Sequence, residues 1–233
     1  MADAEPGEGG PVGQCPACNM DVDEWAPGPG GRPAAKCPHC FSLERHRHLA
    51  VLLRNLAPVL VTSRQILEFA PQPQVRRVLA DIAPHVPVLG TDLFDARWID
   101  FKADGCRLPL KSRSVDVIIS FHVLEHIPDD IQAMREITRV LSDGGLFIMQ
   151  VPYRPNALTD EDPSAPVEER IKRFGQDDHV RWYGHDLNDR LSVAGLNIRF
   201  NEASTVFTQA ELDRYNIPPL DPIWVGRPSP GWR

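Results

Sequence analysis

The chain has 233 residues, of which 42% are hydrophobic and 24% charged, and its formal net charge is −7. This composition is typical of a globular protein, and the length allows one medium domain plus a small appendage. No run of 18 apolar residues predicts a membrane span, and the excess of acid gives no general attraction to nucleic acid or an anionic membrane. The acidic, Gly- and Pro-rich start does not resemble a signal peptide, so we expect a cytoplasmic protein.

Four of the five cysteines form two Cys-x-x-Cys pairs, Cys15 with Cys18 and Cys37 with Cys40. Eighteen residues separate the pairs, a spacing typical of four-cysteine zinc sites. Each pair places two thiolates on one tight turn, and two such turns complete a tetrahedron around Zn²⁺. Because four thiolates leave no open position, the predicted site is structural; the competing interpretation is a redox pair. We therefore expect a disordered leader (1–13), a zinc ribbon (14–41) and a larger domain (42–233).

After the ribbon, helix-like and strand-like segments alternate along the chain. Apolar residues at helical spacing predict helices at 42–56, 75–83, 129–141 and 185–195, with Ser42 capping the first. Buried or alternating segments predict strands at 65–70, 86–93, 98–104, 115–121, 146–153, 196–203 and 221–226, the last two as an antiparallel pair. Residues 154–178 hold three prolines and many charges, and are expected to form an insertion or lid. This alternation predicts an α/β fold with helices on both faces of a parallel sheet.

Two successive segments carry a family resemblance: DVIISFHVLEHIPDD and REITRVLSDGGLFIMQVP. Together with CPHCFSLERHRHL and FGQDDHVRWYGHDL, they make residues 15–226 resemble the class I S-adenosylmethionine-dependent methyltransferases. The chain is most similar to the type 11 subgroup, in a branch with an N-terminal zinc ribbon. The resemblance implies a Rossmann-like, seven-stranded, mostly parallel sheet whose last strand is antiparallel. Ligands of such sheets bind outside the carboxyl ends of the strands, so these ends become the site candidates.

The resemblance implies that S-adenosyl-L-methionine is held at several strand ends. Asp92, followed by Leu93, matches the acid that accepts hydrogen bonds from the ribose hydroxyls, and one carboxylate can accept from both hydroxyls. Asp104 would accept from the adenine amine, and the backbone N–H of Cys106 would donate to the ring. The remaining expected cofactor contacts are Glu68, Ala70, Gly105, Ser120 and Phe121.

The loop after the first sheet strand departs from the family pattern. These enzymes usually have a glycine-rich acidic loop there, whereas this chain has LEFAPQPQ (67–74), without glycine. Pro71 and Pro73 have no N–H to donate and cannot adopt positive φ. The loop must therefore have another shape, with Glu68 keeping an acidic group near the strand end.

Two histidine-bearing segments supply the catalytic candidates. His122 directly follows the strand 115–121 and is a candidate base, since an unperturbed imidazole has a pKa of about 6.5. Glu125 and His126 are expected to support the turn by hydrogen bonding. A metal site formed by the two histidines is an alternative for which the local sequence adds no clear third ligand. In the segment 175–186, Asp178 and His179 form a candidate carboxylate–histidine pair, the structural alternative being a lid-to-helix junction. Expected contacts to the methyl acceptor come from Tyr153, Arg181 and Tyr183.

Three functions follow as alternatives. The first is a methyltransferase for a small-molecule acceptor, with oxygen slightly favoured over nitrogen, as the acidic charge and the long insertion suggest. Positioning of the two reactants would then supply much of the acceleration. The second is an RNA or protein methyltransferase that docks through the ribbon, with residues 45–48 as a basic edge. The third is a non-catalytic binding or regulatory protein, which the missing loop glycines favour.

Overall fold

The computed structural model describes residues 10–231, which fall into two compact units. One unit comprises residues 10–57, 73–82 and 202–221, and the other comprises residues 58–72, 83–201 and 222–231. Most of the expected leader, residues 1–9, lies outside the described residues, whereas Gly13 already begins the first strand. Among residues 10–231, none of the helices combines the length and the apolar character that crossing a bilayer requires.

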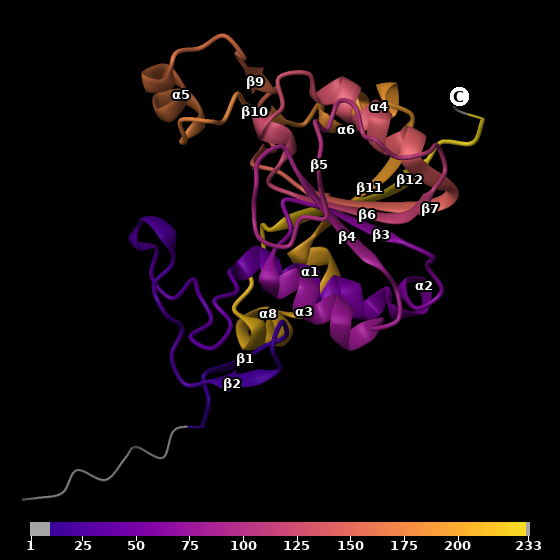
Figure 1. The fold of residues 1–233 in the computed structure, drawn as a ribbon. Coiled ribbons are helices and arrows are strands. Elements are labelled where there is room, and N and C mark those ends of the chain that lie inside the picture. The colour runs from indigo at the N-terminus through magenta and orange to yellow at the C-terminus, as the bar shows by residue number, and fades with distance from the viewer. Residues whose placement is uncertain (1–9, 232–233) are drawn as a thin grey trace, which may run out of the picture. The chain divides into compact units, whose positions relative to one another are not determined.

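A seven-stranded sheet forms the centre of the second unit (Figure 1), in the order β11-β12-β7-β6-β3-β4-β5. Its strands are β3 (Ile66–Phe69), β4 (Val88–Asp92), β5 (Phe101–Lys102), β6 (Val115–Phe121), β7 (Leu141–Gln150), β11 (Leu196–Glu202) and β12 (Pro222–Pro228). Neighbouring strands from β5 to β7 are parallel, and β12 is antiparallel to β7. This topology confirms the predicted Rossmann-like, mostly parallel sheet.

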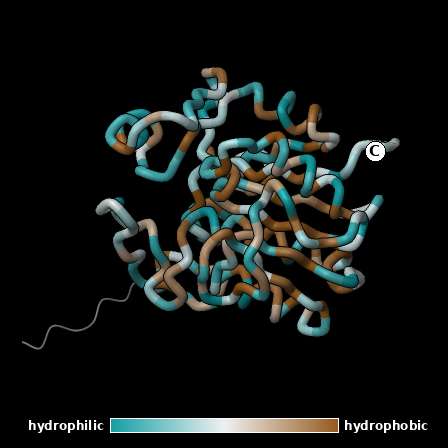
Figure 2. Tube along the Cα trace, turned by 45° about the horizontal axis from the view of Figure 1, so that its top comes forward, coloured by the Kyte–Doolittle hydropathy of each residue, from teal (hydrophilic) through white to brown (hydrophobic). Residues whose placement is uncertain are grey.

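The core of this unit lies between the sheet and two helices, α4 (Asp130–Val140) and α6 (Leu187–Val193). Figure 2 shows apolar residues concentrated along the strands. The β6 sequence VDVIISF is buried at six of its seven positions, as expected for a central parallel strand. Asp129 caps α4 by accepting from the Gln132 N–H, and the Thr138 hydroxyl donates to the Ala194 carbonyl at the end of α6. These bonds fix the helix that follows the HVLEH turn.

The predicted insertion contains regular structure. A small sheet in the order β8-β10-β9 is formed by β8 (Tyr153–Arg154), β9 (Asp160–Glu161) and β10 (Arg181–Gly184). Helix α5 (Val167–Phe174) follows β9 and ends at Gly175, whose φ of 86° closes it in the left-handed conformation. Arg173 in α5 pairs with Asp160 in β9. The second unit also includes the short helix α2 (Ala57–Leu60) and the 3-10 turn η2 (Leu124–His126).

The first unit contains the ribbon and the helices that pack with it. Its elements are β1 (Gly13–Cys15), β2 (Met20–Val22), η1 (Pro29–Gly31), α1 (Glu44–Asn55), α3 (Pro73–Ile82), α7 (Ala203–Val206) and α8 (Gln209–Tyr215). Strands β1 and β2 form an antiparallel hairpin, and α1 contacts α3. A small apolar core is formed by Ala203, Phe207, Leu212 and Ile217.

Helix α1 corrects two sequence-based expectations. Its N-cap is Leu43, whose N–H donates to Nδ1 of His46, so the predicted Ser42 cap is wrong. The expected basic edge is also wrong at three of its four positions, because His46, Arg47 and His48 are buried. Arg47 is fully buried and donates to four backbone carbonyls. These side chains build the unit instead of presenting positive charge to a nucleic acid.

Candidate active site and metal centre

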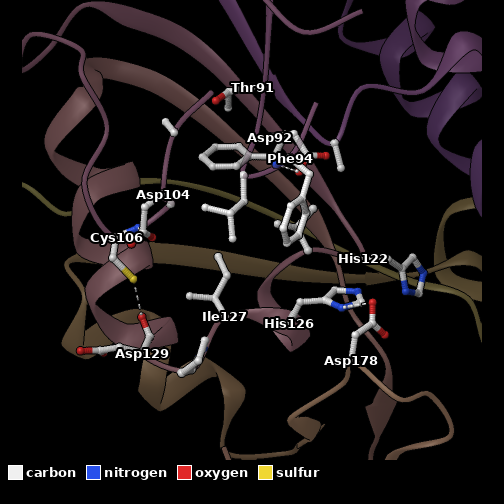
Figure 3. A pocket seen from close by; sticks show the side chains of 17 residues that line it. Thr91, Asp92, Phe94, Asp104, Cys106, His122, His126, Ile127, Asp129 and Asp178 are labelled. Carbon is white, nitrogen blue, oxygen red and sulfur yellow. Dashed lines mark hydrogen bonds and ion pairs between the residues drawn. The ribbon is translucent and has the colours of Figure 1, made fainter. Parts of the chain in front are cut away.

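A cavity of about 620 Å³ lies at the carboxyl ends of the sheet strands in the second unit (Figure 3). Ala70 follows β3, Asp92 ends β4, Asp104 comes two residues after β5, and His122 follows β6; all four line the cavity. The cavity therefore occupies the edge at which parallel α/β sheets bind their ligands. Its volume is that of a small-molecule site.

At the end of β4, Asp92 offers an unused carboxylate oxygen to the cavity, whereas the neighbouring Thr91 hydroxyl is buried. Asp92 accepts from the Phe94 N–H through Oδ1 at 3.1 Å, and no described residue donates to its Oδ2. Thr91 is buried, and its Oγ1 has no hydrogen-bond partner among the described residues. Leu93 and Phe94 are exposed beside them. A ribose diol needs such oxygen acceptors, so this wall fits the sugar of S-adenosylmethionine.

The β5 side of the cavity carries a second acid. Asp104 Oδ1 accepts from the Cys106 N–H at 2.8 Å, so this N–H is already used and is not free for an adenine ring. The Cys106 thiol donates to the Asp129 carbonyl, and its burial together with Asp104 raises its pKa to about 12. Gly105 lies close to Ile127. A Cβ at position 105 would come within 2.9 Å of the Ile127 Cδ1 atom, so a larger residue would require the Ile127 side chain to move. The loop 104–106 thus forms a closely packed cavity wall.

Ala70, directly after β3, has a backbone conformation that favours glycine. Its φ is 46°, a left-handed conformation that residues with a Cβ seldom adopt. Its N–H donates to the Thr91 carbonyl at 2.9 Å, and the Gln72 N–H donates to Glu68 Oε1 at 2.8 Å. Glu68 is buried and does not line the cavity. The structure therefore places Glu68 in the support of this loop.

Two other expected cofactor contacts lie behind the cavity wall. Ser120 and Phe121 at the end of β6 are both buried, and neither lines the cavity. The Ser120 Oγ atom has no hydrogen-bond partner among the described residues. The first residue of the motif to reach the cavity is His122.

His122 is held by its backbone and by Glu125. Its φ of 55° is left-handed, and its N–H donates to the Gln150 carbonyl at 2.9 Å. Its Nδ1 lies 3.0 Å from Oε1 of the fully buried Glu125. When Nδ1–H donates to this carboxylate, Nε2 keeps its lone pair, which is the arrangement of an oriented general base. A non-glycine residue held at positive φ at a strand end is also typical of functional sites.

The expected pair of Asp178 with His179 is replaced by another pair. Asp178 Oδ2 lies 3.2 Å from His126 Nδ1, as the dashed line in Figure 3 shows. Both residues line the cavity. His179 is buried, its Nδ1 lies 3.2 Å from the Phe174 carbonyl, and burial lowers its pKa. Its ring packs edge-on against that of His126, with centroids 4.6 Å apart.

Arg181 and Tyr183 support the turn instead of facing the cavity. Arg181 is fully buried and donates to the carbonyls of Leu124, Ile127 and Pro128. The Tyr183 hydroxyl donates to Asp130 at 2.9 Å, and burial raises the Tyr183 pKa. Their polar groups are occupied by the protein, so the structure does not support the expected contacts to an acceptor.

Tyr153 also lies outside the cavity wall. It packs against Trp224 and Phe200, with ring centroids 5.0 and 5.8 Å away. Sequence reasoning missed Thr91, Phe94, Ile127 and Asp129, which do line the cavity. These four residues could have been proposed from the sequence, because they lie beside predicted strand ends or close to the HVLEH motif.

The four cysteines of the first unit converge on one point. Their sulfur atoms lie within 4.8 Å of one another, with 3.6 Å between Cys15 and Cys40 and 3.9 Å between Cys18 and Cys37. Tetrahedral Zn²⁺ with Zn–S bonds of about 2.3 Å requires sulfur atoms about 3.8 Å apart. The four sulfur atoms therefore fit a zinc ion. All four cysteines are free of disulfides.

Both cysteine pairs form the same backbone turn. The N–H of Asn19 donates to the Cys15 carbonyl at 2.7 Å, and that of Phe41 donates to the Cys37 carbonyl at 3.0 Å. Asn19 and Phe41 both have left-handed φ values, of 60° and 61°. The Cys15 thiol shares its proton with the Cys40 sulfur, which lowers the Cys40 pKa to about 4 and raises that of Cys15. Two equivalent turns presenting paired sulfurs are the geometry of a zinc ribbon.

The seven-stranded sheet and the cavity at its carboxyl ends resemble those of the class I, S-adenosylmethionine-dependent methyltransferases. Residues 63–149 match the methyltransferase domain family. A probable S-adenosylmethionine-dependent methyltransferase from Mycolicibacterium smegmatis is 47% identical over 134 residues, which cover 51% of this chain and 51% of that protein. The chain thus matches about half the length of this curated relative.

Solved structures share the fold at low sequence identity. A methyltransferase from Mesorhizobium loti has a TM-score of 0.52 and 20% identity, covering 76% of this chain and 96% of that one. The [4+2]-cyclase SpnF has a TM-score of 0.55 and 17% identity, covering 79% of this chain and 84% of that one. Because SpnF is a cyclase, the fold alone does not determine the reaction.

Proposed function

We propose that the protein transfers a methyl group from S-adenosylmethionine to a small-molecule acceptor, with oxygen favoured over nitrogen as the acceptor atom. The observation that carries this proposal is the position of His122. It lines the same cavity as Asp92 and Asp104, and its Nδ1 is paired with the buried Glu125. The cavity thus combines acceptors for a nucleoside with an oriented imidazole.

In this proposal the cofactor supplies an electrophilic methyl group on a sulfonium. Asp92 accepts from the ribose hydroxyls through the oxygen that no described residue uses. Asp104 accepts from the adenine amine. His122 takes the acceptor proton on Nε2, while Glu125 holds Nδ1 and stabilises the imidazolium. Glu68, Ala70 and the loop that they shape close the methionine end.

The charges of the cavity wall support a small acceptor. Four carboxylates line it, from Asp92, Asp104, Asp129 and Asp178, and its imidazoles belong to His122 and His126. An acidic wall repels a phosphate backbone and favours a neutral or cationic acceptor. The burial of His46, Arg47 and His48 also removes most of the basic edge on which RNA docking depended.

The acceptor class can be tested directly by label transfer. Purified, zinc-replete protein is incubated with cofactor labelled in the methyl group and with cell extract. The extract is then separated into small molecules, RNA and protein. The proposal predicts label in the small-molecule fraction, and loss of transfer with His122→Ala. Label in RNA or protein would overturn the acceptor class, and no transfer into any fraction would support the non-catalytic alternative. Heat-inactivated protein is the control.

A further inference from the structure

Glu125, His126 and His179 bring three metal-ligating side chains together beside the cavity. Their ligand atoms all lie within 4.8 Å of one another. Glu125 and His126 belong to the turn after β6, whereas His179 comes from the segment before β10. The Val180 N–H donates to the Glu125 carbonyl at 2.9 Å, which joins the two segments at this point.

The hydrogen bonds of the two histidines leave one ring nitrogen of each available. The Phe174 carbonyl can only accept, so His179 donates to it through Nδ1 and keeps a lone pair on Nε2. His126 is paired in the same way through Nδ1, with the Asp178 carboxylate. Metal-binding histidines usually donate their second N–H to a carbonyl or carboxylate, which fixes the tautomer. Both histidines have this arrangement.

Glu125 supplies the independent observation. Its side chain is fully buried, and Oε1 is used by His122. Its Oε2 atom is buried and has no hydrogen-bond partner among the described residues. Burying a carboxylate oxygen without a partner is unfavourable. A cation at the cluster would remove this cost while Oε1 continues to hold His122.

We propose that Glu125, His126 and His179 bind a divalent transition-metal ion. Two imidazoles and one carboxylate suit Zn²⁺, Fe²⁺ or Mn²⁺. Tetrahedral Zn²⁺ with bonds of about 2.0–2.1 Å places its ligand atoms about 3.4 Å apart, so modest side-chain movement closes the site. Three protein ligands leave at least one position open, unlike the four-cysteine site of the first unit.

The open position suggests what the ion does. His126 also lines the cavity, so a ligand bound to the ion would lie next to His122. Resting on the proposed function, we infer that the ion holds a hydroxyl oxygen of the methyl acceptor. A bound hydroxyl would have a lowered pKa and would give its proton to His122 more readily.

The test uses Mn²⁺, because nitrogen and oxygen ligands accept it while thiolate sites prefer Zn²⁺. Full-length protein with its cysteine site filled by zinc is titrated with Mn²⁺, and the spectrum of free Mn²⁺ is followed by electron paramagnetic resonance. We expect one Mn²⁺ per wild-type chain. His126→Ala, His179→Ala and Glu125→Gln should each weaken binding at least tenfold, whereas His185→Ala, at an exposed histidine outside the cluster, should bind like the wild type.

Two readouts keep the test decisive. Circular dichroism and thermal melting identify any variant that does not fold; because His126 is partly exposed, its variant provides the comparison if the His179 variant unfolds. No binding of Mn²⁺ and no second equivalent of Zn²⁺ by the wild type would overturn the metal site. Unchanged Mn²⁺ affinity in folded His126→Ala and Glu125→Gln variants would also overturn the metal site. Cofactor affinity is measured on the same zinc-loaded samples before Mn²⁺ is added, so failure of the methyltransferase proposal is seen separately.

Discussion

The backbone N–H of Val180 donates to the carbonyl oxygen of Glu125 at 2.9 Å. This bond joins the turn after β6 to the segment that leads into β10. Arg181 strengthens the same junction from the next position, with three bonds to carbonyls of the turn and its continuation. The orientation of His122 therefore depends on residues far from it in sequence, because Glu125, which holds its Nδ1, lies in this turn.

Arg181→Met should destabilise the protein strongly. The substitution removes a fully buried guanidinium that donates to the carbonyls of Leu124, Ile127 and Pro128. We expect the free energy of unfolding to fall by about 3 kcal/mol, the size of loss typical when one partner of a buried charged interaction is removed. Urea denaturation measures it, with Arg135→Met, at an exposed position of α4, as a control that should change by less than about 0.5 kcal/mol. Equal effects of the two variants would contradict the positioning role.

Ala70→Gly should stabilise the protein. The left-handed φ of Ala70 costs roughly 1–2 kcal/mol for a residue with a Cβ, while glycine adds about 0.4–1 kcal/mol of unfolded-state entropy. We therefore expect a net gain of about 0.5 kcal/mol in denaturant unfolding. Ala133→Gly, in the helical conformation of α4, should lose about 1 kcal/mol or more. A loss at both positions would show that Ala70 is not strained.

Cys37→Ser should lower the zinc content by one equivalent per chain. The substitution removes one of four converging sulfur atoms, and a structural zinc site contributes directly to the folding of its unit. The zinc content of both variants is measured after dialysis. Cys106→Ser is the control: it changes a thiol outside the cluster and should keep the wild-type zinc content. Wild-type zinc in Cys37→Ser would contradict the ribbon.

The Cys106 thiol should react slowly with disulfide reagents. Its pKa of about 12 leaves roughly a thousandth of the thiolate of an ordinary cysteine at pH 8. The higher nucleophilicity of a more basic thiolate offsets part of this difference, so we expect a rate about 40-fold lower than that of a free cysteine. Between pH 7 and 10 the rate should rise tenfold per pH unit, as thiolate forms. A rate that levels off near pH 9 would mean an ordinary pKa.

The sheet could be predicted from sequence because its signals are local. The strand predicted at 115–121 has the same bounds in the structure, since a continuous apolar run after a turn is distinctive. The positions of Asp92, Asp104 and His122 at the cavity follow from the strand ends on which they lie. The partners of Asp178 and Arg181 could not be predicted, because they depend on how a segment of irregular structure folds back onto the turn. The left-handed conformation of Ala70 has no sequence signal at all.

We propose that the cavity at the strand ends binds S-adenosylmethionine through Asp92. Calorimetric titration of zinc-replete protein with S-adenosylhomocysteine tests it, on the wild type, on Asp92→Ala and on Asp95→Ala, an exposed acid outside the cavity wall. We expect micromolar binding by the wild type and by Asp95→Ala. Asp92→Ala should bind about 10- to 100-fold more weakly, the loss expected for hydrogen bonds to a charged group. Absence of binding by the wild type, or equal affinity of wild type and Asp92→Ala, would contradict the account.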